Sequence, residues 1–313
     1  MSKSAHFKID PKLAELLGET YKSTEDALKE LIDNSYDADS ENVKIQLPEI
    51  LDSEPIIIIE DDGSGMKENE LRTEYLKIAS SRFVRKGATS YIKKRVVKGR
   101  KGIGKFSGLM VAEIMEVITK AGGKETHLTI IKSDLAKQKY DLDKVDLPIE
   151  IKDCAKEEHG TTIILKGINQ NFYYPNAEKL KQILIWDYGR VIDFSIYVNN
   201  EKIGIQDYQG TTIEKELDLE DGKSAKIVYT ISNKPVKQPG LIYRVGDKIV
   251  GRPENFLKDD EIIPDKLKKR IVGEIICDDL DDFVTADWSS LIEGNKLNEI
   301  IKEEVKTELK SSL

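Results

Sequence analysis

Apolar positions in the first part of the chain follow two periods, and the period changes several times. Over residues 24–38 the apolar side chains recur every three or four positions, which predicts an amphipathic helix. Ser23 and Thr24 supply hydroxyls that can cap its N-terminus, and Glu25 and Asp26 place negative charge beside its dipole. Two more helices are predicted over residues 67–79 and 102–119.

Strand patterns lie between these helices. Residues 43–47 alternate apolar and polar side chains, whereas residues 56–59 are four isoleucines and predict a fully buried strand. Residues 128–131 and 161–165 are also typical of strands. Because strands and helices follow one another without regular βαβ alternation, we expect an α+β sandwich.

A polar stretch at residues 167–175 marks a domain boundary. A helix pattern follows over residues 177–188, and a charged helical pattern ends the chain at residues 297–313. The strands expected between them lie at residues 194–198, 225–229, 241–245 and 271–276. We therefore predict a first domain over residues 1–170 and a second α+β domain over residues 171–313, ending in the C-terminal helix.

Composition narrows the classes of function. A length of 313 residues agrees with two domains, and a net charge of -8 argues against a protein that coats nucleic acid over its whole surface. The two cysteines and three histidines have no zinc-site spacing. The N-terminus lacks the apolar core of a signal peptide, and no apolar run is long enough to cross a bilayer. We expect a cytoplasmic protein without a membrane partner.

One segment differs from the rest in charge. Residues 82–105 hold ten lysines or arginines and no acidic residue, and they show no sustained apolar period. Long loops of this kind in compact domains are often functional lids. We therefore predict a mobile lid over about residues 80–105, whose local positive charge leaves DNA open as a partner.

Three polar residues share one side of the first predicted helix, because Glu30, Asn34 and Asp37 are spaced i, i+4, i+7. The amide oxygen of Asn34 can ligate Mg²⁺, which often takes only one or two protein ligands. Glu30, one turn earlier, could orient and deprotonate a water molecule. Taken alone, the triplet also fits a solvated acidic helix face.

A second acidic site follows the isoleucine strand. Asp61 stands at its end, where a carboxylate needs a partner and can accept a hydrogen bond from the amino group of adenine. Gly63 and Gly65 allow the backbone to approach a flat ring closely. Alone, this pattern is also that of an ordinary turn.

A basic glycine loop runs from Gly99 to Lys105 and has the spacing of a P-loop. Phe106 follows, where that motif needs Ser or Thr for Mg²⁺, and no apolar strand precedes the loop. We therefore reject a P-loop. A glycine-rich turn that opens a helix still offers backbone amides to phosphate.

These stretches, in this order, resemble the GHKL ATPase superfamily, which includes gyrase B-type topoisomerases, heat-shock-ninety chaperones, MutL, MORC proteins and histidine kinases. Residues 30–38 resemble its Asn-containing helix, 61–66 its adenine turn, 99–108 its glycine box and 160–162 its Gly-Thr element. The resemblance covers about residues 10–167 and implies a Bergerat-type α/β sandwich that binds ATP and Mg²⁺.

The resemblance also implies site roles. Glu30 would be the general base and Asn34 the metal ligand. Asp61 would bind the adenine amino group, with support from Thr161 through its hydroxyl and a water molecule, and Asp37 would support the same end. Gly102, Gly104 and Lys105 would contact phosphates. The expected nucleotide-binding set is Asn34, Asp37, Asp61, Gly63, Gly65, Met66, Gly102, Ile103, Gly104, Lys105, Phe106 and Thr161.

Glu30 favours the hydrolysing branches, and residues 239–248 resemble part of a MutL- or MORC-type transducer domain. In those branches ATP orders the lid and drives dimerisation. We therefore expect an ATP-dependent homodimer that acts on DNA as a clamp or gate. The alternatives are a protein-remodelling chaperone and a nucleotide sensor that recruits an effector protein.

Overall fold

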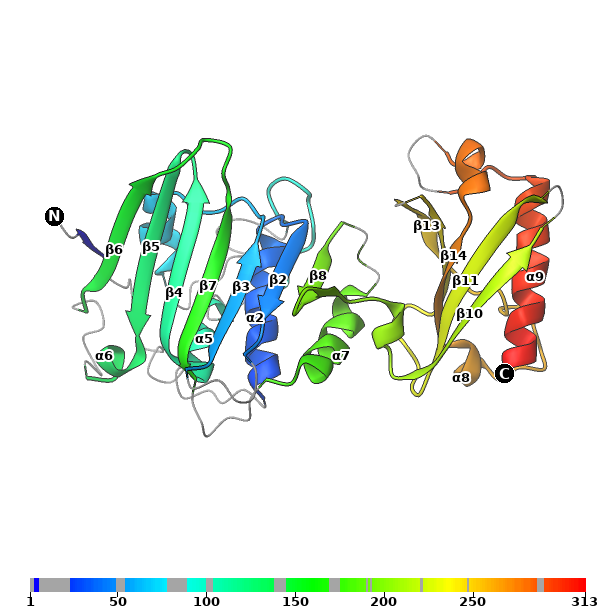
Figure 1. The fold of residues 1–313 in the computed structure, drawn as a ribbon, viewed down its shortest axis with the longest axis horizontal. Helices are drawn as coiled ribbons and strands as arrows, with labels where there is room; N and C mark the ends of the chain where they lie inside the picture. Colours follow the sequence, from blue (N-terminus) through cyan, green and yellow to red (C-terminus); the bar gives the residue numbers. More distant parts are fainter. Residues whose placement is uncertain are drawn as a thin grey trace. The chain divides into compact units, whose positions relative to one another are not determined.

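The computed structural model describes residues 3–5, 23–48, 54–77, 89–99, 104–137, 145–168, 175–189, 191, 193–219, 222–246, 248–285 and 290–313. The chain divides into two compact units (Figure 1). The first contains Met1–Ile183 and Asp193–Lys202, and the second contains Leu184–Ile192 and Ile203–Leu313. The division therefore falls later in the sequence than the predicted boundary at residues 167–175.

The first unit is built on a mixed sheet with the strand order β1-β6-β5-β4-β7-β3-β2-β8-β9, counted over the described residues. Neighbouring strands are antiparallel except β2 and β8, which are parallel. Its strands are β1 (Lys3–Ala5), β2 (Asn42–Gln46), β3 (Ile56–Asp61), β4 (Ala112–Ala121), β5 (Lys124–Ile131), β6 (Leu147–Asp153), β7 (Gly160–Ile168), β8 (Ser195–Val198) and β9 (Glu201–Lys202). The helical elements are α2 (Thr24–Asp37), α3 (Glu68–Glu70), η1 (Leu71–Tyr75), η2 (Gly104–Phe106), α5 (Gly108–Val111) and α6 (Lys132–Lys137). The division into units falls inside α7 (Ala177–Tyr188), after Ile183.

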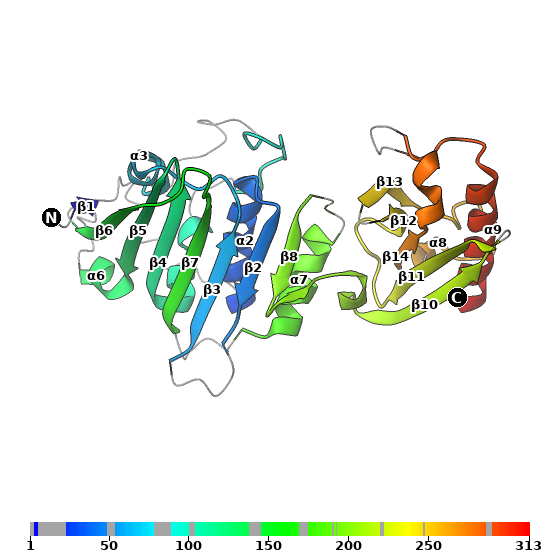
Figure 2. The same cartoon turned by 45° about the horizontal axis from the view of Figure 1, so that its top comes forward.

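The helix α2 forms where the periodicity predicts it. The Ser23 hydroxyl accepts a hydrogen bond from the backbone amide of Asp26 at 3.2 Å and caps the helix. The apolar stripe made by Ala27, Leu28, Leu31 and Ile32 is at most 1% exposed. Figure 2 shows α2 beside β2 and β3, on the same face of the sheet as α5. The opposite side of α2 thus carries the polar residues.

Two sequence predictions in this unit are wrong. The isoleucine strand is not fully buried: Ile57 and Ile59 are at most 1% exposed, but Ile56 is 38% exposed, because alternate side chains of β3 point to an uncovered face. The helix predicted over residues 102–119 ends at Val111, and β4 begins at the next residue. Val117, Ile118 and Thr119 are β-branched, and pairing with β5 and β7 on both sides decides for strand.

A third prediction placed the strand at residues 194–198 in the second unit. Instead, β8 pairs in parallel with β2, with Val43 opposite Ile196. This pairing extends the first sheet and brings Asp193 and Phe194, which precede β8, to the C-terminal end of α2.

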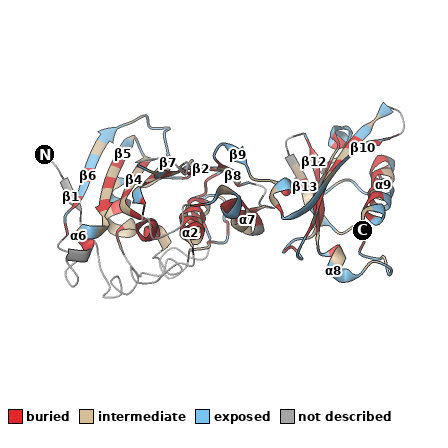
Figure 3. Ribbon diagram, turned by 60° about the horizontal axis from the view of Figure 1, so that its bottom comes forward, coloured by how far each residue is buried: buried red, intermediate tan, exposed pale blue. Residues whose placement is uncertain are grey.

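The second unit has a sheet with the strand order β10-β11-β14-β12-β13, in which only β12 and β14 are parallel among the described strands. The helix α9 packs against it and carries its buried residues on one side (Figure 3). The elements of the second unit are η4 (Ile205–Asp207), β10 (Gly210–Asp218), β11 (Ser224–Ser232), β12 (Gly240–Val245), β13 (Lys248–Glu254), α8 (Asp265–Lys268), β14 (Ile271–Ile276), η6 (Asp278–Phe283) and α9 (Lys296–Ser312).

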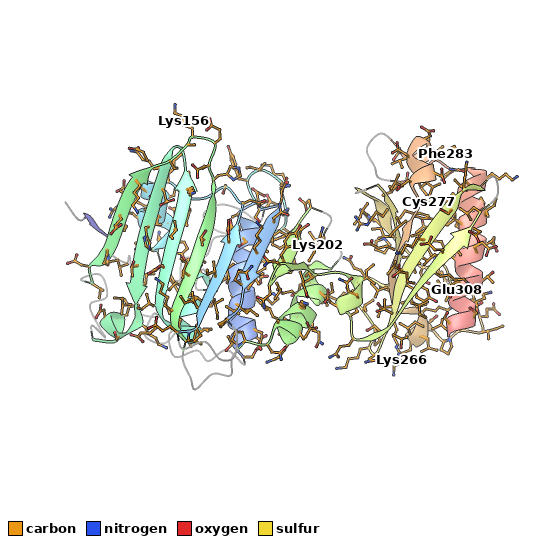
Figure 4. All side chains as sticks on the ribbon, viewed as in Figure 1. Lys156, Lys202, Lys266, Cys277, Phe283 and Glu308 are labelled. Atoms are coloured by element: carbon orange, nitrogen blue, oxygen red, sulfur yellow. The ribbon has the colours of Figure 1, made fainter. Side chains whose placement is uncertain are left out.

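A hydrogen bond between α9 and β11 lies at the edge of the core of the second unit. Glu308, labelled on α9 in Figure 4, accepts a hydrogen bond from the Tyr229 hydroxyl at 3.0 Å and pairs with Lys215. Cys277 is a buried member of the same core, and burial raises the pKa of its thiol.

Candidate active site

The carboxylate of Asp61 is held from three elements at the end of β3. Its Oδ1 accepts the backbone amides of Gly63 at 2.9 Å and Thr161 at 3.3 Å, and its Oδ2 accepts the hydroxyl of Ser35 at 2.9 Å. Burial raises the pKa of this carboxyl to about 6, since the cost of burying its charge exceeds what the hydrogen bonds recover. Ser35, on α2, was not predicted from the sequence.

The glycines of the turn after β3 are required by close backbone packing. Gly65 has φ 61°, and a Cβ there would lie 2.0 Å from the carbonyl oxygen of Lys120. A Cβ on Gly63 would lie 2.8 Å from the carbonyl oxygen of Ala38. The turn therefore packs between α2 and β4, and its shape is set by backbone contacts on both sides.

Thr119 on β4 ties this turn to β7. Its hydroxyl oxygen accepts the amide of Met66 at 2.9 Å and lies 3.2 Å from the hydroxyl of Thr161. Thr119 is completely buried. The predicted residues Asp61, Met66 and Thr161 are thus brought together, and a residue absent from the prediction connects them.

Glu30 and Asn34 meet the glycine loop on the polar side of α2. A Cβ added to Gly104 would lie 2.2 Å from Oε2 of Glu30, and one added to Gly99 would lie 3.8 Å from Oδ1 of Asn34. Gly104 thus lies so close to the Glu30 carboxylate that a Cβ would displace it, whereas Gly99 lies at ordinary contact distance from Asn34. The polar side of α2 therefore lies beside the glycine loop, just as the Asp61 turn lies beside β7, the strand with the Gly-Thr element.

Asp37, one helical turn after Asn34, binds the same loop. Its two carboxylate oxygens accept the backbone amides of Lys98 at 2.8 Å and Gly99 at 2.9 Å. The prediction gave Asp37 a supporting role at the adenine end. The contacts of its carboxylate instead hold the chain that enters the glycine loop.

Lys105 and Phe106 contact η1 and the residues that follow it. The Lys105 ammonium donates to the carbonyl oxygens of Glu74 at 3.2 Å and Lys77 at 2.7 Å. Phe106 is buried and packs edge-on against Tyr75. These two bonds use two of the three N–H donors of the ammonium. Gly102 and Ile103 lie outside the described residues.

The basic hairpin (residues 89–99) is the described part of the predicted lid, and it is anchored to the C-terminal end of α2. Arg95 is 7% exposed; its guanidinium donates to the carbonyl oxygen of Ser40 at 2.7 Å and pairs with Asp193 at 2.8 Å. The Asp39 carboxylate accepts the amides of Ile92 at 2.7 Å and Lys93 at 3.1 Å. Neither anchor was predicted.

The residues at the phosphate end fit a magnesium ion that is bound mostly by water and phosphate oxygens. Among the described residues, no group of three or more His, Cys, Asp or Glu side chains could hold a metal. The Nδ2 atom of Asn34 is buried and has no hydrogen-bond partner in the described part of the chain. A half-turn of this amide about its last side-chain bond puts its oxygen in the same place, where it can ligate a cation.

Comparison with known proteins agrees with this geometry. Residues 21–161 match the model of the family described as histidine kinase-, DNA gyrase B- and HSP90-like ATPases. This segment holds α2, the Asp61 turn, the glycine loop and the start of β7. The segment therefore has the α/β fold of GHKL-type ATPases, as the resemblance implied.

The similar proteins belong to two kinds. A putative type II restriction enzyme, HgiDII of Herpetosiphon aurantiacus, is 28% identical over 82% of this chain and 47% of its own length. The chaperone protein HtpG of Borreliella afzelii is 28% identical over 71% of the chain and 37% of its own length, and HtpG of Treponema denticola is 29% identical over 62% and 34%. The chain thus spans less than half the length of these relatives.

Proposed function

We propose that the protein binds ATP with Mg²⁺ and hydrolyses it. The observation that carries this proposal is the approach of the glycine loop to α2, where Gly99 and Gly104 lie against Asn34 and Glu30. A carboxylate, an amide and two glycines of a basic loop thus gather at one point. Such a set suits a triphosphate, a cation and an attacking water molecule.

The two ends of the site have separate tasks in this proposal. At one end, the Asp61 carboxylate accepts a hydrogen bond from the adenine amino group, with the Thr161 hydroxyl beside it. At the other end, the Glu30 carboxylate orients a water molecule and takes its proton as the water attacks the γ-phosphate. Asn34 would hold Mg²⁺, which supplies charge compensation for the phosphate oxygens.

A turnover assay with the purified protein tests the proposal. ATP should be hydrolysed in the presence of magnesium, and EDTA should stop the reaction. Nucleotide binding without turnover under all magnesium concentrations would favour the third alternative, a nucleotide sensor that recruits an effector. A protein that binds no ATP at all would refute both.

We further propose that ATP binding closes the lid and drives homodimerisation, and that the dimer acts on DNA. The similarity to a restriction enzyme supports a DNA partner, because that match extends over 82% of the chain. The charge of the basic hairpin adds little support. Arg95 is buried, Lys93 pairs with Glu41 at 2.8 Å, and the Lys98 ammonium lies over the Tyr36 ring at 5.0 Å.

A protein-remodelling chaperone is the second candidate, because several of the similar proteins are HtpG chaperones. The two candidates differ in what stimulates hydrolysis. Duplex DNA should raise the ATPase rate of a DNA-acting clamp, and the effect should fall steeply with salt as counterions compete. Stimulation by an unfolded model protein, with no response to DNA at low salt, would favour the chaperone. Sedimentation with and without a non-hydrolysable ATP analogue tests the dimer.

A further inference from the structure

Thr119 lies on β4, next to the strand β7 that carries Thr161. On β4 it stands directly opposite Thr161 of β7 on one side and opposite Thr126 of β5 on the other. Side chains of directly opposite residues point to the same face of a sheet. All three hydroxyls therefore belong to one row across the first sheet.

The three threonines differ in their hydrogen bonds. Thr119 accepts the Met66 amide at 2.9 Å, lies 3.2 Å from the Thr161 hydroxyl and is 3.3 Å from the Gly160 carbonyl oxygen. The Thr126 hydroxyl is equally buried but has no hydrogen-bond partner among the described residues. Burial and strand position alone thus do not account for the contacts of Thr119.

We propose that Thr119 is a positioning residue for the adenine end of the nucleotide site. Its hydroxyl fixes the backbone of the turn at Met66 and the orientation of the Thr161 hydroxyl, two groups expected to lie beside the base. This inference rests on the proposed ATP site. The hydroxyl acts through other residues, since at 0% exposure Thr119 itself cannot reach a ligand.

The position of Thr119 determines which kinetic constant should change. Glu30 and Asn34 are on α2, and the hydrogen bonds of Thr119 with described residues go to Met66, Thr161 and Gly160, outside that helix. Loss of the hydroxyl would leave the Met66 amide without its acceptor and release the Thr161 hydroxyl, which weakens base binding. The chemical step at the other end would be unaffected, so KM should rise while kcat stays the same.

Thr119→Val and Thr126→Val provide a matched pair. Both replace a buried threonine hydroxyl by a methyl group of similar shape on neighbouring strands. Thr119→Val should weaken ATP binding about tenfold, as expected for one lost hydrogen bond that leaves a buried donor unpaired. Thr126→Val should bind ATP like the natural protein. Thr119→Ser keeps the hydroxyl and should restore most of the affinity.

The outcomes separate this inference from the proposed function. If the natural protein binds no ATP, both fail. If it binds ATP and Thr119→Val binds equally well, or if Thr126→Val weakens binding as much, only the role of Thr119 is refuted. Should Thr119→Val not fold, hydrogen exchange in the natural protein remains decisive: the Met66 amide must be protected, and exchange as fast as at an exposed amide would refute the proposed contact.

Discussion

The two ends of the candidate site are built in different ways. At the adenine end, Asp61 and Thr119 lie on strands and the Met66 amide lies on the turn after β3, and each takes part in at least one hydrogen bond. At the phosphate end, the Asn34 amide nitrogen is buried without a described partner and the Lys105 ammonium is bound to carbonyl oxygens. The sheet thus supplies a preformed recognition site, whereas the groups for chemistry depend on a helix and a loop.

The largest effect should follow from neutralising the adenine end. Asp61→Asn should lower ATP affinity about a hundredfold or more, because an amide nitrogen replaces an acceptor of the adenine amino group. The fold should survive, since Asn can still accept the Gly63 and Thr161 amides through its oxygen. Calorimetric titration with ATP, with a thermal melt as control, measures both quantities. Unchanged affinity would show that Asp61 does not bind the base.

The anchor of the basic hairpin should matter next. Arg95→Met should lower the free energy of unfolding by about 3 kcal/mol, because a buried guanidinium bonded to Asp193 and Ser40 is removed. The adjacent, exposed Lys94 is the control, and Lys94→Ala should change the stability by less than about 0.5 kcal/mol. Urea denaturation measures both variants. Equal stability would mean that the hairpin is not held by Arg95.

The pKa of Asp61 predicts a pH dependence of ATP binding and another of stability. Since the carboxyl has a pKa of about 6, ATP affinity should fall about tenfold between pH 7.5 and pH 5, as the acceptor becomes protonated. Stability should change in the opposite direction. The folded-state pKa is raised above the ordinary 3.8, so the charged carboxylate destabilises the fold at neutral pH. As pH falls from about 6 to 3.8 the group takes up its proton and the free energy of unfolding rises. The Asp61→Asn variant should lose both dependences, and its retention of either would contradict the assignment.

Replacement of Lys105 should have the smallest effect, and it tests whether this residue of the phosphate end binds nucleotide. Lys105→Met should lower the free energy of unfolding by about 1 kcal/mol through loss of its bonds to two carbonyl oxygens. If the ammonium moves to phosphate when ATP binds, KM should also rise a few-fold. A changed melting temperature with an unchanged KM would restrict Lys105 to a structural role.

Local patterns in the sequence predicted some of the elements that carry the candidate site residues better than the contacts among those residues. Periodicity placed α2 correctly, and with it the spacing of Glu30, Asn34 and Asp37. The helix predicted over residues 102–119 was wrong in its second half, where β4 forms. The apolar residues there suit either period, and only pairing with β5 and β7 decides between helix and strand.

The missed residues share one property: each works through a partner far away in the sequence. Ser35 binds Asp61, Thr119 binds Met66, and Arg95 binds Asp193. No local signal sets these hydroxyls apart from other buried threonines and serines. An arginine inside a basic loop likewise resembles a surface charge until the strand β8 brings an acid beside it.

The central claim is that the two ends act separately, and Glu30→Gln tests it most directly. Glutamine has the size of glutamate, so it fits against Gly104, but it cannot take a proton from water. ATP binding by calorimetry should stay within about threefold of the natural protein, while single-turnover hydrolysis should slow at least about a hundredfold. Unchanged hydrolysis would remove Glu30 from the chemistry, and a loss of binding as large as that of Asp61→Asn would contradict the division of the site into two ends.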